Sequence, residues 1–133
     1  MDVPALVSLL EWPSGHRPVL AATLGPGPRP PARIAAAVLA GLGDGATELV
    51  LSRRMTRGHA DPAHRVLSAA LSRGRSVLVH LVDRTAHARR VLLDASARHL
   101  ASAVALVRGP RDTVGGFVAQ LAGEGWSAAV VLR

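Results

Sequence analysis

Five short apolar runs alternate with stretches of helical periodicity, and this alternation constrains the fold more than any other feature of the sequence. The runs lie at residues 19–23, 48–52, 76–82, 101–107 and 127–132. Each run is too short for a buried helix and is rich in the Val and Leu side chains typical of buried strands. Strands that alternate with helices favour a parallel sheet whose crossover helices cover both faces. We therefore expect an α/β fold, a three-layer sandwich with a five-stranded parallel sheet.

The helical stretches predict one domain with a short extension before it. Residues 1–15 have apolar side chains at helical spacing, including Leu6 and Leu10, and predict an N-terminal amphipathic helix. Residues 16–133 have the length of a single domain. The extension either packs on this domain or binds a protein partner, and the sequence leaves both open. The remaining helices are expected to begin near Pro31, Asp61, Thr85, and Asp112 or Thr113.

The positive charge of the chain comes entirely from arginine. The formal net charge is +7, and all sixteen basic residues are Arg. The codon usage of a high-GC bacterium explains this composition. An alternative explanation is binding of phosphate or nucleic acid, because Arg makes bidentate contacts with phosphate. Nucleic acid is not favoured, since the three aromatic residues are too few for a base-stacking platform. They are Trp12, Phe117 and Trp126.

Cysteine, long apolar runs and a basic leader are all missing. The absence of cysteine excludes disulfides and thiolate chemistry. No apolar run approaches the roughly 18 residues that a bilayer span requires. Residues 1–4 lack the basic region of a secretory signal. We therefore expect a cytoplasmic protein with no membrane span.

Signatures of catalytic and metal sites are also missing. The six histidines lack the spacing of a zinc site, and no serine lies in a nucleophile elbow. His80 lies within an apolar run and is interpreted as a hydrogen-bonded core residue. No phosphate-binding glycine motif follows a predicted strand, because prolines interrupt residues 25–28 and lack the N–H donor. The sequence predicts no catalytic and no metal-binding residues, and it favours a function other than catalysis.

The order of elements resembles the universal stress protein family. From Val77 onward the sequence predicts a strand, Asp83, an Arg-rich helix, a further strand and a glycine-bearing loop. Residues 115–117, Gly-Gly-Phe, then precede Gly123 and a Val-rich strand at 130–133. This order is similar to the C-terminal half of a universal stress protein domain.

The resemblance extends to the front half and implies a topology. Residues 17–26 are similar to the first strand and loop of that family, and residues 45–51 to its second strand. The family has a Rossmann-like or flavodoxin-like sheet with strand order 3-2-1-4-5, so the last strand lies at an edge. Family members pair such edge strands. The resemblance therefore implies a homodimer through residues 127–133.

The resemblance also implies a nucleotide site. In ATP-binding members of the family, the ligand lies between the end of the first strand and the glycine-rich loop after the fourth. The matching positions are candidate cofactor-binding residues in this chain. They are Thr23, Gly25, Arg108, Gly109, Arg111, Gly115 and Gly116.

Several departures from the family pattern fall on that site. Leu24 occupies the position of a ligand-contacting Asp, Asp112 replaces a glycine, and Glu124 replaces a hydroxyl residue. The two acidic residues are expected to place negative charge near the phosphates. The departures predict a degraded nucleotide site with no cofactor. Arg108 or Arg111 could still provide an anion site at a helix start.

Besides the Arg-mediated binding of nucleic acid considered above, these observations leave three functional hypotheses. The first is a non-catalytic, universal stress protein-like module that acts through homodimerisation or partner docking. The second is an adenine-nucleotide-binding stress regulator or weak ATPase. The third rests on a weaker resemblance of residues 22–26 and 104–108 to strands of pyruvate kinase, which implies a degenerate fragment of that barrel. The chain has no lysine to match the catalytic Lys of pyruvate kinase, and 133 residues are too few for a complete barrel.

Overall fold

A computed structural model describes most of the chain. It covers residues 2–10, 18–27, 30–52, 61–73, 76–97, 103–121, 123–124, 126 and 128–132. The elements in chain order are α1 (Val3–Leu10), β1 (Val19–Leu24), α2 (Ala32–Leu42), β2 (Thr47–Leu51), α4 (Asp61–Leu71), β3 (Val77–Leu81), α5 (Ala86–Ala97), β4 (Ala103–Gly109), α6 (Arg111–Leu121) and β5 (Ala128–Leu132). All five predicted strands are present, and each begins and ends within two residues of its apolar run.

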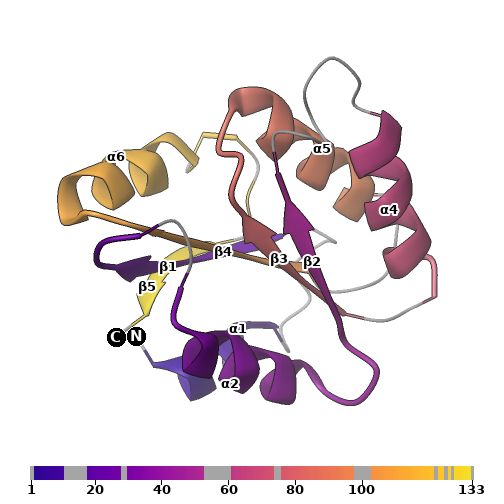
Figure 1. Cartoon of the computed structure of the whole chain (residues 1–133), viewed down its shortest axis with the longest axis horizontal. Helices are drawn as coiled ribbons and strands as arrows, with labels where there is room; N and C mark the ends of the chain where they lie inside the picture. The colour runs from indigo at the N-terminus through magenta and orange to yellow at the C-terminus, as the bar shows by residue number, and fades with distance from the viewer. Residues whose placement is uncertain are drawn as a thin grey trace.

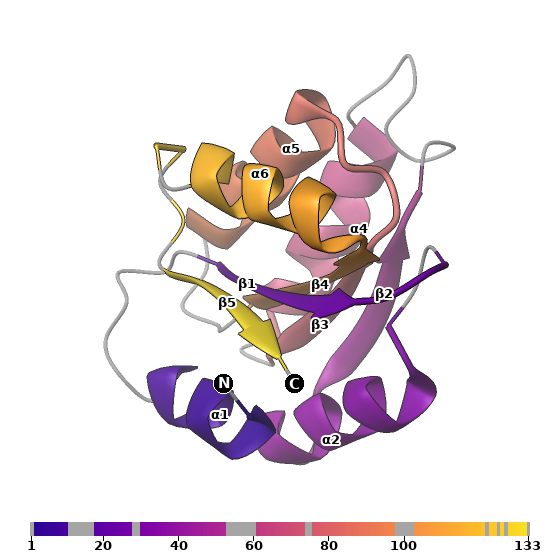
Figure 2. The same cartoon turned by 90° about the vertical axis from the view of Figure 1, so that its left-hand side faces the viewer.

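The strands form one parallel sheet between two layers of helices, as Figures 1 and 2 show. Helices α1 and α2 cover one face, and α4, α5 and α6 cover the other. Alternate side chains of each strand enter the two layers. In β1, Leu20 packs with α4, α5 and α6, whereas Val19 and Ala21 pack with α1 and α2. The expected α/β class and three-layer architecture are confirmed.

The strand order differs in part from the expected 3-2-1-4-5. The sheet runs β2-β3-β4-β1-β5, so the pairs β2–β3 and β1–β4 and the edge position of β5 are as expected. The predicted pairing of β1 with β2 and the predicted pairing of β4 with β5 are wrong. The burial of the strands gives the physical reason. β3 is buried along its whole length, whereas β2 is partly exposed and carries Glu48. A strand buried on both faces suits the interior, and a strand with a charged residue suits an edge.

Helix α1 is part of the core of the domain. The Leu6 side chain is fully buried and packs with Val19, Ile34 and Leu132. The Asp2 side chain accepts a hydrogen bond from the Ala5 N–H at 2.9 Å and so caps the helix. The burial of Leu6 favours packing of the N-terminal helix on the domain over binding of a protein partner. The side chains of Leu9 and Leu10 lie outside the described residues. Within the described part of the chain, no helix is long and apolar enough to cross a bilayer.

Two of the helix starts predicted from capping residues have different outcomes. Thr85 caps α5, because its hydroxyl accepts a hydrogen bond from the Ala88 N–H at 3.2 Å. The prediction that Asp112 or Thr113 caps α6 is wrong. α6 begins at Arg111, and the Val114 N–H donates to the Pro110 carbonyl at 2.9 Å. Pro110 therefore occupies the position just before the first residue of the helix.

The connections after β1 and β4 diverge. The chain leaves β1 for α2 on one face of the sheet, and it leaves β4 for α6 on the other. These two strands are neighbours, with Thr23 beside Arg108 and Leu24 beside Gly109. In open parallel sheets, a crevice for ligands forms where adjacent strands send their connections to opposite faces. The topology therefore places a candidate site at the ends of β1 and β4.

Candidate functional site

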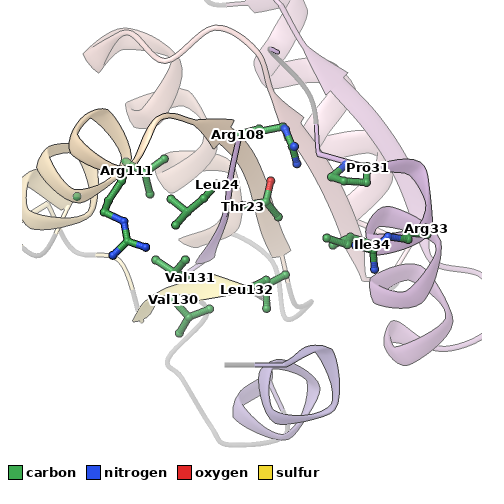
Figure 3. Close-up of a pocket in the computed structure, with 12 residues that line it drawn as sticks. Thr23, Leu24, Pro31, Arg33, Ile34, Arg108, Arg111, Val130, Val131 and Leu132 are labelled. Atoms are coloured by element: carbon green, nitrogen blue, oxygen red, sulfur yellow. The ribbon is translucent and has the colours of Figure 1, made fainter. Parts of the chain in front are cut away.

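A pocket of about 830 Å³ lies at this edge of the sheet (Figure 3). The ends of β1, β4 and β5 and the starts of α2 and α6 contribute to its wall. Its size lies within the range of small-molecule sites in proteins. The lining residues are Thr23, Leu24, Pro31, Arg33, Ile34, Arg108, Arg111, Val114, Gly115, Val130, Val131 and Leu132.

The strand ends supply mostly apolar side chains. Thr23 is buried, and its hydroxyl donates to the Val107 carbonyl at 3.4 Å. Leu24 is the last residue of β1 and remains 36% exposed. Val130 and Val131 of β5 line the pocket beside these residues (Figure 3). The strands thus form an apolar surface that the core of the protein does not cover.

Arg108 is held at the end of β4 by the loop after β1. Its Nε donates to the Pro26 carbonyl at 2.9 Å, and its own carbonyl accepts a hydrogen bond from the Arg84 guanidinium. The Gly25 N–H donates to the Gly109 carbonyl at 3.1 Å and extends the pairing of β1 with β4. Gly25 has a φ of +143°, and a Cβ there would overlap the Arg108 guanidinium. Glycine at this position therefore leaves the space in which Arg108 lies.

Two helix starts border the pocket from opposite layers. Pro31 and Arg33 belong to the start of α2, and Arg111 and Val114 to the start of α6. Each helix N-terminus carries a partial positive charge from its unpaired N–H groups. Arg33 and Arg111 are exposed, and no described residue forms an ion pair or hydrogen bond with either guanidinium. Together, Arg33, Arg108 and Arg111 form the basic rim of the pocket.

The two acidic replacements expected near this site, Asp112 and Glu124, lie outside the described lining of the pocket, although Asp112 is in the first turn of α6 next to Arg111. No acidic side chain belongs to the described lining of the pocket. Asp112 is exposed on α6 outside the lining. Glu124 accepts hydrogen bonds from the Nε and Nη2 of Arg89 at 2.8 and 2.7 Å. Arg89 is 4% exposed, and its guanidinium lies 5.2 Å from the centre of the Phe117 ring. Glu124 is therefore part of a structural ion pair.

This ion pair shifts the pKa values of both partners. The hydrogen bonds from Arg89 lower the pKa of Glu124, and the nearby positive charges of Arg89 and Arg90 act in the same direction. The hydrogen bond to Glu124 raises the pKa of Arg89 above its ordinary value. Both groups therefore stay charged at neutral pH, and they link α5 to the segment after α6.

The structure brings together only part of the candidate cofactor-binding set. Thr23, Arg108, Arg111 and Gly115 line the pocket. Gly25 and Gly109 support it through their mutual hydrogen bond and are not part of the lining. Gly116 lies on an exposed position of α6 and is also outside the lining.

Sequence reasoning missed the lining residues from α2 and β5. Arg33 and Ile34 follow the proline-rich segment after β1, which leads into the helix predicted to begin near Pro31. The missed signal was the helix start directly after it. Val130 and Val131 were assigned to β5, which the expected strand order placed beside β4. The observed pairing of β5 with β1 brings them to the pocket instead.

His80 is buried on β3, and its Nε2 lies 3.2 Å from Oε1 of Glu48 on β2. No described residue pairs with its Nδ1. His80 was expected to be a hydrogen-bonded core residue. Its Nε2 has a partner among the described residues, and its Nδ1 has none. Among the described residues, no cluster of His, Asp and Glu could hold a metal ion.

Comparisons with known proteins do not assign this chain to a class. No protein family, no curated protein and no solved structure matches it. The resemblance to universal stress proteins and that to pyruvate kinase therefore stay predictions.

Proposed function

We propose that this chain binds a small phosphorylated anion in the pocket at the ends of β1 and β4. The observation that carries the proposal is the basic rim, Arg33, Arg108 and Arg111, around a pocket whose described lining contains no carboxylate. The N-termini of α2 and α6 add partial positive charge from both sides. An anion here would meet attraction from several directions, and Asp112 in the first turn of α6 is outside the lining.

Phosphate is the anion that this arrangement suits best. Arg presents a planar fork of N–H donors that matches phosphate oxygens, and such charge-assisted bonds are stronger than neutral ones. Arg33 and Arg111 are accessible to a ligand because they are exposed. Arg108 keeps one N–H engaged with Pro26, which orients its guanidinium. The phosphates of an adenine nucleotide, the ligand that the family resemblance implies, fall within this class.

The proposal predicts that pyrophosphate binds and that Arg111 is needed. Isothermal titration calorimetry on the whole chain measures this directly. Loss of a charge-assisted hydrogen bond costs about 1.5–3 kcal/mol, so Arg111→Ala should weaken binding by at least about tenfold. Arg73→Ala is the matched control. Arg73 is an exposed arginine after α4, outside the pocket, and its loss removes the same charge.

The control separates a local site from general attraction to a basic protein. Equal losses of affinity in Arg111→Ala and Arg73→Ala would show that the net charge of +7, and not the pocket, attracts the anion. Such a result, or no measurable binding by the unaltered chain, contradicts the proposal. Steep loss of DNA or RNA affinity with added salt would instead support the nucleic-acid alternative.

A second candidate function is homodimerisation through β5. One observation favours it, the position of β5 at the edge of the sheet, where it pairs with β1 alone among the described strands. Val130 and Val131 are partly exposed there. An edge strand can pair with a second copy through its backbone donors and acceptors. This candidate is compatible with anion binding and is independent of it.

A further inference from the structure

Half of the residues that line the pocket are apolar side chains apart from the basic rim. Leu24 is one of two exposed large apolar side chains among the described residues, and the other, Val66, lies on α4 outside the pocket. Burial of Leu24 would be favourable, yet no element of the described fold covers it. The apolar lining residues are Leu24, Ile34, Val114, Val130, Val131 and Leu132.

The described lining lacks the groups that hold a nucleoside. Sites for dinucleotides at such switch points use a carboxylate to accept hydrogen bonds from ribose hydroxyls. The described lining contains no carboxylate and no aromatic ring for a base to stack on. The Thr23 hydroxyl is already bonded to the Val107 carbonyl. The side chains here can bury an aliphatic group, but they offer few partners to a sugar or a base.

The basic rim and the apolar lining residues lie close together. In Figure 3 the Arg111 side chain extends from α6 toward Val131, and the Arg33 side chain lies beside Ile34. A molecule that fills the pocket would therefore meet guanidinium groups at its rim and aliphatic side chains along its wall. A ligand with a charged head and an aliphatic body satisfies both surfaces.

We propose that the ligand is a phosphate or diphosphate ester of an aliphatic alcohol. The phosphate would bind the basic rim, and the alkyl chain would cover Leu24, Ile34 and Val130. This inference rests on the proposed anion site and specifies the body of the ligand. The volume of about 830 Å³ limits that body to a small molecule.

Three phosphate monoesters with different bodies test the inference. Methyl phosphate, hexyl phosphate and adenosine monophosphate carry the same head group, so differences in affinity report on the body alone. Each buried methylene group improves affinity by roughly fourfold. Hexyl phosphate should therefore bind at least about tenfold more tightly than methyl phosphate, and more tightly than adenosine monophosphate. Isothermal titration calorimetry on the whole chain gives the three dissociation constants.

A pair of variants locates the preference for hexyl phosphate. Leu24→Ser should reduce the affinity for hexyl phosphate by about fivefold or more and leave that for methyl phosphate unchanged. Val66→Ser makes the same kind of change at the other exposed apolar side chain and should alter neither affinity. Because both residues are exposed, both variants should fold, and circular dichroism checks this.

The outcomes distinguish failure of this inference from failure of the proposed site. Equal affinity for methyl and hexyl phosphate overturns the aliphatic body and leaves anion binding in place. Tighter binding of adenosine monophosphate also overturns it and supports a nucleotide ligand. If none of the three esters nor pyrophosphate binds, the anion site itself is wrong. Loss of the preference in Val66→Ser as well as Leu24→Ser would overturn the assignment of the alkyl chain to the pocket.

Discussion

Gly25 and Arg108 depend on each other, because the arginine occupies the space that any larger residue at position 25 would fill. Gly25→Ala should destabilise the protein by about 1 kcal/mol through its positive φ. It should also displace the Arg108 guanidinium from Pro26 and weaken binding of pyrophosphate by about fivefold or more. Chemical denaturation and calorimetry measure the two effects.

Gly27→Ala is the control for this substitution. Gly27 also has a positive φ, +96°, but a Cβ there would meet no atom within 4 Å. Its replacement should cost a similar amount of stability and leave pyrophosphate affinity unchanged. Equal loss of affinity in both variants would contradict the role given to Arg108.

The Arg89–Glu124 pair makes stability depend on pH in the acid range. The pKa of Glu124 is lower in the folded protein than its ordinary value of 4.5. Its contribution to stability is therefore complete above the unfolded value and is lost as the pH falls through the folded value. The free energy of unfolding should decrease in this range, and Glu124→Gln should remove part of that decrease.

The size of this effect follows from the partial exposure of Glu124. Its side chain is 29% exposed, so we expect Glu124→Gln to cost about 1–2 kcal/mol at neutral pH and less at low pH. Urea denaturation at several pH values measures both quantities. If the free energies of unfolding of Glu124→Gln and the unaltered protein differed by the same amount from neutral to acid pH, this pair would not cause the pH dependence of stability.

Helix α6 contains two glycines that a helix would ordinarily avoid. Gly116 is exposed, and a Cβ there would meet no atom within 4 Å. Gly116→Ala should therefore stabilise the protein by about 0.5–1 kcal/mol, because alanine loses less conformational entropy in a helix. Pyrophosphate affinity should stay the same, since Gly116 lies outside the lining. Thermal unfolding and calorimetry test both statements.

Gly43 provides the opposite case at the end of α2. It caps that helix with a φ of +99°, which alanine rarely adopts. Gly43→Ala should lower the stability by about 1 kcal/mol. If both substitutions were destabilising, the assignment of Gly116 to regular helix would be wrong. If Gly116→Ala weakened the binding of pyrophosphate, the position of Gly116 outside the pocket would be wrong.

In the described part of the chain, the two edge strands of the sheet differ in character. β5 carries Val130 and Val131, whereas β2 at the other edge carries Glu48. If the chain dimerises as proposed, β5 should be the edge that pairs, since charge on an edge strand opposes pairing. Sedimentation should show two chains per particle. Amide hydrogen exchange should slow with concentration in β5 and not in β2. A single-chain mass at all concentrations, or protection in β2, would contradict this prediction.

The elements of the fold were predictable because their signals are local. The apolar period of a strand or helix and a capping residue such as Thr85 act over a few neighbouring positions. The sequence therefore determined five strands, their alternation with helices and the α/β class. The candidate residues Thr23, Arg108 and Arg111 came from the family resemblance and not from a local signal, and all three line the pocket.

Only the tertiary structure decided which strands are neighbours and which side chains share a pocket. Pairing depends on burial of whole strands against two helical layers, and that burial sets β3 inside the sheet and β2 at its edge. The same packing brings β5 beside β1, so that Val130 and Val131 line the same pocket as Leu24. It also joins Glu124 to Arg89, across 35 positions of sequence, and keeps that carboxylate out of the pocket. These contacts join distant segments, and local periodicity does not encode them.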